Sequence, residues 1–292
     1  MAKSKLAARP PLISNIAKHL DSIPRRTLSE DQLHQLMFEH GQQWRLGPSF
    51  KFGDLVEALS DKGLRIIRLR SRSGRVVTRY AWRNASEYGV ALSLYGNLYL
   101  SHLSAMVLHD LTDQVPSVMY VNREQSPKPS QGRLTQSGID LAFSRPARES
   151  QLVYEFEGRR ITVLSGKSSG RLEVGRILVN DGEELAATNI ERTLVDIVVR
   201  PNYSGGVPQV LAAFERARSR ISVNVLVATL RKLAHVYPYH QAIGFFMSRA
   251  GYSEQQLALL RQFPVRFKFY VAHGMRQPDF DSAWRVYYPK GL

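Results

Sequence analysis

Between Leu64 and Arg83 the chain carries seven arginines and no acidic residue: Arg65, Arg68, Arg70, Arg72, Arg75, Arg79 and Arg83. A guanidinium group can grip a phosphate with two hydrogen bonds, and each phosphate that it neutralises releases counterions from duplex DNA. The residues between these arginines are largely β-branched, and a turn-forming run at 71–74 divides them, which predicts a β-hairpin. We therefore predict a hairpin that contacts DNA phosphates. The alternative is a solvated edge hairpin whose charges prevent aggregation.

Helical patterns precede the hairpin and must position it. A short helix is expected over residues 12–20 and a second over residues 29–40. Ser29 and Gln32 can satisfy each other's backbone N–H groups as a capping box, which fixes where the second helix begins. Arg25, Arg26 and Arg45 lie in the loops on either side of the second helix and are expected to extend the phosphate contacts.

A third helix is expected to begin at a Ser49 cap, to carry apolar residues at helical spacing, and to end at Gly63. Three helices and a hairpin predict a winged helix-turn-helix domain over residues 1–85, whose third helix lies in a major groove. The opposite face of this helix should carry Lys51, Asp54, Ala58, Asp61 and Lys62. Because aspartates repel phosphates, we expect the hairpin to supply more of the affinity than the helix. The predicted DNA-binding residues are Arg25, Arg26, Arg45, Ser49, Lys51, Lys62, Arg65, Arg68, Arg70, Arg72, Arg75 and Arg79.

The remaining residues, 86–292, are expected to form a larger mixed α/β domain, so that the whole chain is α+β. A helix over 101–110, a strand over 117–121 and a polar loop near 126–137 come first. A hairpin around Glu157 and Gly158 follows, and a capping box at 188–191 opens a helix that runs to residue 199. The carboxyl-terminal part is mainly helical, with helices beginning near residues 207, 222, 238 and 253, then strands over 265–271 and 284–288.

Four segments, in this order, are similar to the AbiEi family of antitoxins: residues 99–116, 120–128, 188–201 and 237–252. The resemblance covers most of residues 80–252 and is looser over the first 80. It implies a winged helix that binds the promoter of its own operon and an antitoxin domain that counteracts a nucleotidyltransferase toxin. It also implies a role in abortive infection, a form of phage defence, and usually no stable complex with the toxin.

Composition limits the partners. The formal net charge is +15 over 292 residues, which favours a polyanionic partner, double-stranded DNA before a membrane surface. The chain has no cysteine, so thiolate metal sites and cysteine nucleophiles are excluded, and a cytoplasmic location is expected. Neither a signal peptide nor an apolar run of spanning length is recognised, so no membrane association is expected.

Catalytic chemistry finds little support in the sequence, and we expect no enzyme activity, no cofactor and no metal. Residues 165–168 (SGKS) lack the first glycine of a phosphate-binding loop and favour a basic turn. A metal-dependent nuclease would need a Glu-x-Lys element, whereas Glu157 is followed by Arg159, with Asp140 as the other acid. His102 and His109 are too far apart along a helix to share one ion. The alternative to a repressor is a protein-interaction module that binds the toxin or another partner directly, with DNA binding secondary.

Overall fold

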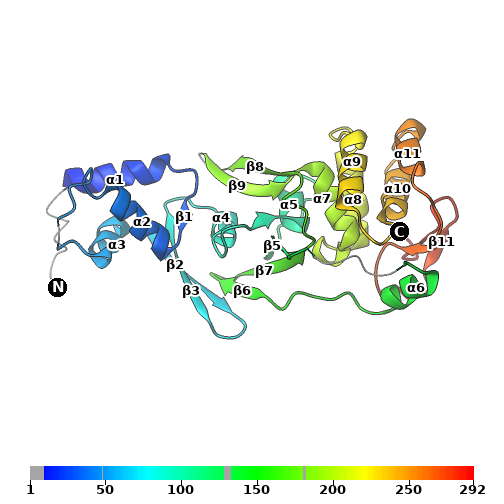
Figure 1. The fold of residues 1–292 in the computed structure, drawn as a ribbon, viewed down its shortest axis with the longest axis horizontal. Helices are drawn as coiled ribbons and strands as arrows, with labels where there is room; N and C mark the ends of the chain where they lie inside the picture. Colours follow the sequence, from blue (N-terminus) through cyan, green and yellow to red (C-terminus); the bar gives the residue numbers. More distant parts are fainter. Residues whose placement is uncertain (1–9, 48, 128–132, 180–181) are drawn as a thin grey trace. The chain divides into compact units, whose positions relative to one another are not determined.

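A computed structural model describes residues 10–47, 49–127, 133–179 and 182–292, and it has the mixed α+β character that the sequence predicts (Figure 1). Its contacts define two compact units. Unit 1 comprises 1–98, 152–161 and 176–186, and unit 2 comprises 99–151, 162–175 and 187–292. The units therefore combine separate stretches of chain, whereas the sequence predicts one boundary after residue 85. That boundary stays a prediction about independently folding domains.

Unit 1 begins with three helices and a hairpin, in the order α1 (Pro10–Ser22), β1 (Thr27–Leu28), α2 (Glu30–His40), α3 (Phe52–Ser60), β2 (Leu64–Ser71) and β3 (Val76–Trp82). Figure 1 shows the three helices gathered beside β1. The strands are antiparallel in the order β1-β3-β2-β6, where β6 is Val153–Phe156. Apolar residues from all three helices pack on Tyr80 and Trp82 of β3 to form the core of this unit.

The capping box at the start of α2 is confirmed. Ser29 accepts a hydrogen bond from the Gln32 backbone, and the Gln32 side chain accepts one from the Ser29 backbone. The predicted Ser49 cap of α3 is wrong, because Ser49 lies in a turn and the helix begins after Lys51. The Asp54 carboxylate accepts a hydrogen bond from the Lys51 backbone N–H at 2.9 Å, so an acid inside the first turn satisfies the helix start instead.

Unit 1 also contains α4 (Glu87–Leu92). Three strands have residues in both units: β7 (Arg159–Gly166), β8 (Val174–Val179) and β9 (Glu183–Thr188). The predicted hairpin of β6 and β7 is confirmed, and its turn residues Glu157 and Gly158 have φ of 45° and 75°. Two consecutive positive φ values are what a tight hairpin turn requires. The sequence does not predict α4, β8 or β9.

Unit 2 opens with β4 (Tyr99–Leu100), α5 (His102–Leu108), β5 (Val118–Glu124) and α6 (Gln136–Ser144). Within it β5 lies between β7 and β4, and β4 pairs in parallel with β9. The polar loop predicted to extend to residue 137 ends earlier, because Thr135 caps α6 with a side-chain oxygen that accepts from the Gly138 backbone. Residues 128–132 of that loop lie outside the described residues.

The helical part of unit 2 matches the predicted starts: α7 (Ile190–Val199), α8 (Val207–Ala217), α9 (Val223–Leu233), α10 (Tyr239–Arg249) and α11 (Glu254–Arg261). Figure 1 shows α8 to α11 grouped together, and α7 packs on α5, α8, α9 and α10. The cap of α7 is Asn189 rather than the predicted Thr188, since the Asn189 side chain accepts from the Arg192 backbone at 2.8 Å.

The end of the chain forms a small sheet of β10 (Phe269–Tyr270), β12 (Val286–Tyr288) and β11 (Asp279–Asp281), in that order. The predicted strand over 265–271 is reduced to its two residues Phe269 and Tyr270. The alternation in that stretch reflects the burial of Phe269 and Val271 and the partial burial of Phe267 against the helical core. A period-two pattern alone does not distinguish such burial from a strand.

Candidate functional site

The β2–β3 hairpin places its arginines on two different faces. Arg68 pairs with Thr78 and Arg70 with Val76, so these two arginines share one face and are exposed. Arg65 and Arg79 project from the other face, because the direction of side chains alternates along a strand. The structure thus brings together two of the strand arginines that the sequence proposed and separates them from the other two.

The hairpin turn adds two exposed cations, Arg72 and Arg75. Ser71 donates its backbone N–H to the Arg75 carbonyl at 2.8 Å, and Gly74, at φ 84°, donates to the Ser71 carbonyl at 2.9 Å. These bonds close the turn, so that Arg72 lies within it and Arg75 directly follows it. We call Arg68, Arg70, Arg72 and Arg75 the hairpin cluster.

Arg79 has a structural role. Its Nε donates to the Ser93 carbonyl at 2.9 Å, its Nη2 to the Leu94 carbonyl at 3.2 Å, and its Nη1 to the Thr78 carbonyl. Burial lowers the pKa of Arg79, an effect that Asp31 opposes. A guanidinium whose donors are used in this way ties β3 to the turn after α4 and has little left to offer a phosphate.

The remaining predicted residues of unit 1 differ in exposure. Arg65 is exposed and lies 3.6 Å from Glu157 in an ion pair. Arg26 is 7% exposed and its Nη1 donates to Asn84, so burial removes it from the surface that a duplex could reach. The other predicted contacts are all exposed: Arg25, Arg45, Ser49, Lys51 and Lys62.

Helix α3 presents a less basic surface than a groove-reading helix requires. Ala58 is buried rather than exposed, which corrects the predicted face, and Glu57 is exposed instead. Asp54 is half-buried, and Asp61 and Lys62 are exposed just beyond the helix. Carboxylates on this face repel phosphates, so the hairpin cluster is the better candidate for electrostatic contact.

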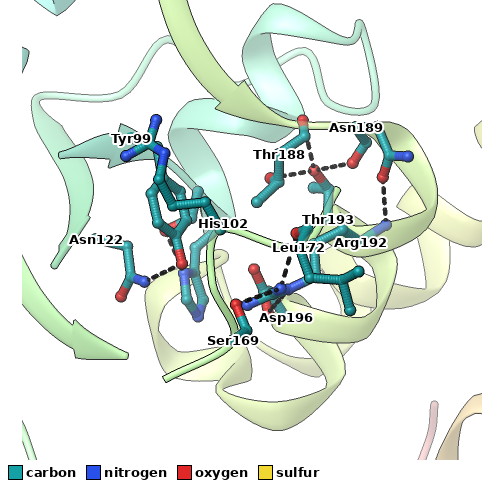
Figure 2. Close-up of polar contacts among 12 residues, drawn as sticks. Tyr99, His102, Asn122, Ser169, Leu172, Thr188, Asn189, Arg192, Thr193 and Asp196 are labelled. Carbon is teal, nitrogen blue, oxygen red and sulfur yellow. Dashed lines mark hydrogen bonds and ion pairs between the residues drawn. The ribbon is translucent and has the colours of Figure 1, made fainter. Parts of the chain in front are cut away.

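A second candidate site lies wholly within unit 2 and was not foreseen. It is a pocket of about 270 Å³ lined by residues from α5, β5, β7 and α7 and the loops beyond: His102, Asn122, Gln125, Gly166, Lys167, Arg192, Asp196, Val199, Arg200 and His235. The lining combines three permanent cations with one carboxylate. Figure 2 shows the lining residues His102, Asn122, Arg192 and Asp196, of which the last two belong to α7.

Arg192 and Asp196 form a buried ion pair one helical turn apart. Arg192 Nε donates to Asp196 Oδ1 at 2.8 Å, and Nη1 donates to the Leu172 carbonyl at 3.0 Å and to Ser169 Oγ (Figure 2). Burial raises the pKa of Asp196, and the Arg192 guanidinium opposes that shift. Good hydrogen bonds around the pair offset part of the cost of removing two charges from water.

The two histidines of the pocket are held neutral. Burial, followed by the charges of Lys167, Arg192 and Arg200, lowers the pKa of His235 to about 3. Burial and the same two arginines hold the pKa of His102 well below its usual value. His102 Nδ1 and Ser101 Oγ share one hydrogen bond at 2.9 Å. The buried Nε2 of His235 has no hydrogen-bond partner among the described residues.

Asn122 forms one wall. Its Nδ2 donates to the hydroxyl of Tyr99 (Figure 2), and its side chain lies against Gly166 so closely that a Cβ there would come within 2.7 Å of Asn122 Cγ. Burial raises the pKa of Tyr99 strongly, so its hydroxyl stays protonated. A glycine at 166 is therefore required by close approach rather than by its backbone angle.

A sequence signal for this pocket existed. Gly166 and Lys167 line the pocket and belong to the SGKS run at residues 165–168. No helix follows this run directly, so it is not a phosphate-binding loop. Arg192 and Arg200 lie within residues 188–201, one of the segments from which the antitoxin resemblance is predicted. The sequence predicts the helix α7, but not that it buries Arg192 and Asp196.

The other chemistries that were considered have structural explanations. His109 donates to the Thr188 carbonyl at 2.6 Å, and Asp140 accepts from Gln136 and Tyr270. Within the described ranges, no three or more histidine and acidic side chains cluster closely enough to hold a metal ion. No helix of the described part has both the length and the apolar character that a membrane span needs.

Comparisons with known proteins give a likeness of fold among solved structures. No family model matches the chain, and no curated protein does. Among solved structures, the chain is similar to the RV2827C protein from Mycobacterium tuberculosis, with a TM-score of 0.55 and 14% sequence identity over 95% of this chain and 91% of that one. At this identity the likeness concerns the fold, which by itself assigns no function.

Proposed function

We propose that this protein binds double-stranded DNA through a winged helix formed by α1 to β3. The observation that carries the proposal is the hairpin cluster: Arg68 and Arg70 share one exposed face of β2, and Arg72 lies within the adjoining turn, which Arg75 follows. The order of three helices around β1, followed by an antiparallel hairpin, supports this proposal, because a winged helix-turn-helix domain combines such helices with a hairpin. Four guanidinium groups on one hairpin fit a row of phosphates.

Phosphate contact dominates this proposed interface. Helix α3 exposes Glu57 and is preceded by one lysine, Lys51, so base reading by α3 would rest on few side chains. Contacts with phosphates position a protein without reading sequence, which implies moderate preference for one operator over random DNA. Lys51 and Lys62, at the two ends of α3, are the proposed additional contacts.

The biological role that we propose is that of an antitoxin that represses its own operon and counteracts a nucleotidyltransferase toxin in the cytoplasm. The support for this role is the resemblance of residues 99–116, 120–128, 188–201 and 237–252 to the AbiEi family, together with a net charge of +15. Binding upstream of its own gene would exclude RNA polymerase, and the protein would need neither catalysis nor a cofactor.

A gel-shift titration across a salt series tests the DNA proposal. Wild-type protein is titrated against the upstream region of its own gene and against a random duplex. Each phosphate contact contributes about −0.9 to the slope of log K against log salt, so Arg68→Ala/Arg70→Ala should flatten the slope by about 2. The matched control is Arg266→Ala/Arg276→Ala, which removes two exposed arginines of unit 2. Equal slopes for wild type and the Arg68/Arg70 variant would reject the hairpin interface.

A protein-interaction module is the second candidate, and Phe38 favours it. This residue of α2 is 90% exposed, which is unusual for a large aromatic side chain on a helix. Co-purification with the product of the neighbouring gene, lost in Phe38→Ser and retained in Arg68→Ala/Arg70→Ala, would support direct toxin binding through α2.

A further inference from the structure

The unit 2 pocket carries an excess of positive charge that its own residues leave unbalanced. Lys167, Arg192 and Arg200 line it with Asp196 as the carboxylate among the lining residues. Asp196 is engaged by Arg192 at 2.8 Å and also interacts electrostatically with Arg200, while Glu124 acts on Arg192 from outside the lining. Three cations and one carboxylate among the lining residues still leave the walls with a net charge of +2. The volume of about 270 Å³ is near the lower end of the range for small-molecule sites.

Backbone carbonyls, rather than carboxylates, hold the two outer cations. Lys167 Nζ donates to the Ala234 carbonyl at 2.7 Å, and Arg200 Nη2 donates to the Ser165 carbonyl at 3.1 Å. Gln125 Nε2 also donates to the Ser165 carbonyl, at 3.0 Å. A carbonyl orients a cation without neutralising it, so these contacts position positive charge and leave it available to an anion.

Neutral donors complete the lining. The buried Nε2 of His235 has no hydrogen-bond partner among the described residues, and an unpaired polar atom in a protein interior is costly. The imidazole of His235 is neutral, and the tautomer with its proton on Nε2 can donate to an acceptor in the pocket. An anion that accepts from His235, Lys167 and Arg200 together would satisfy all three groups.

We propose that this pocket binds the phosphate group of a small ligand, either inorganic phosphate or a nucleoside phosphate. A phosphate dianion matches the net charge of +2 that the lining residues carry, and its several oxygens can accept from Lys167, Arg200 and His235. Duplex DNA is a poor fit because Arg192 and His102 are buried, at 3% and 5% exposure, where a backbone phosphate within a duplex does not reach. The proposal is independent of the DNA interface, since each concerns residues of a different unit.

The test is isothermal titration of the full-length protein, in a buffer free of phosphate and sulfate, with inorganic phosphate, AMP and ATP as separate ligands. Lys167→Ala and Arg200→Ala should each weaken binding by tenfold or more. The matched control is Lys232→Ala, which removes an exposed lysine of α9 outside the pocket lining. Because Lys167 is exposed, its removal should leave the thermal unfolding midpoint unchanged, so loss of binding in that variant does not reflect loss of fold.

Each outcome decides the proposal. AMP or ATP binding at least tenfold tighter than phosphate identifies a nucleotide site, whereas equal or tighter binding of phosphate identifies a site for the free anion. Absence of binding by all three ligands, or binding that Lys167→Ala and Arg200→Ala leave intact, overturns the proposal. If these variants instead weaken DNA binding in gel shifts, the pocket belongs to a nucleic-acid surface and the proposal is wrong. Loss of DNA binding in Arg68→Ala/Arg70→Ala with phosphate binding retained keeps the two proposals separate.

Discussion

Arg70 of β2 lies directly opposite Glu155 of β6 in the antiparallel register of unit 1. Side chains of directly opposed residues share a face, so Glu155 lies on the same side of the sheet as Arg68 and Arg70. The sequence from Leu64 to Arg83 contains no acid, yet folding brings one to these arginines from a strand more than eighty residues later. Glu155, which also pairs with Arg160 at 4.0 Å, therefore offsets part of the positive charge of the hairpin cluster.

Glu155→Gln should tighten DNA binding. The substitution keeps the size of the side chain and removes one negative charge from the face that we propose to lie against phosphates. The Glu155 side chain is 67% exposed, so solvent screens its charge and the expected gain in affinity is modest, roughly twofold to fivefold at low salt and smaller at high salt. Gel-shift titration at two salt concentrations measures the gain.

The matched control is Glu184→Gln, which removes an acid of β9 in unit 1 that pairs with Arg176 at 3.1 Å. It changes the net charge of the protein by the same amount. If both variants gain affinity equally, total charge alone explains the result and the face shared by Glu155 and Arg70 has no special part. Weaker binding by Glu155→Gln would contradict the assigned interface.

Arg79→Lys should destabilise unit 1 and leave the salt dependence of DNA binding unchanged. Lysine retains the charge but cannot reproduce the fork that reaches the Ser93 and Leu94 carbonyls. The loss of two hydrogen bonds to buried or half-buried carbonyls costs about 1–3 kcal/mol in the free energy of unfolding. Chemical denaturation measures this cost, with Arg68→Lys, at an exposed arginine of β2, as the control that should not change stability.

The amino-terminal elements could be predicted from sequence because their signals are local. The capping box at Ser29, the turn at residues 71–74 and the β-branched runs beside it each fix structure within a few residues. The same locality explains the failure at α3, where the Asp54 side chain competes with Ser49 for the helix start and the choice depends on burial of Leu55 and Leu59.

The pocket could not be predicted because its parts are far apart in the chain. Residues 102, 122, 167, 192 and 235 come together through the packing of α7 on α5 and the order of β7, β5 and β4, which no local pattern specifies. The position of Glu155 opposite Arg70 could not be predicted for the same reason. The charges next to a residue in the sequence do not give the electrostatic potential at its site, because that potential depends on the charges that are close in space.

The free energy of unfolding should fall as the pH falls from about 6.5 toward 3, and His235 should account for part of that loss. In the unfolded chain the imidazole takes up a proton near its ordinary pKa of 6.5, whereas burial and nearby cations lower the pKa of folded His235 to about 3. The unfolded state therefore binds more protons in this window, and stability increases with pH. His102, whose pKa is also lowered, acts in the same direction.

His235→Gln should reduce the slope of stability against pH between about 6 and 4 by up to about 1.4 kcal/mol per pH unit, the value for one proton. Urea denaturation at several pH values measures the slope. The control is His34→Gln, which replaces a histidine of α2 whose side chain is 52% exposed. Identical slopes for wild type and His235→Gln would mean that His235 takes up its proton equally readily in the folded protein.

Gly166→Ala should both lower stability and disturb the pocket. The added Cβ would come within 2.7 Å of Asn122 Cγ, and Asn122 is buried, so its side chain must move and release the Tyr99 hydroxyl. Overpacking of this kind costs about 1–3 kcal/mol. Gly175→Ala is the control, because no atom lies within 4 Å of a Cβ at that position. The melting temperature and the phosphate affinity should both change in Gly166→Ala, and neither should change in Gly175→Ala. An unchanged melting temperature for Gly166→Ala would show that Asn122 moves without cost and that the wall it forms is not rigid.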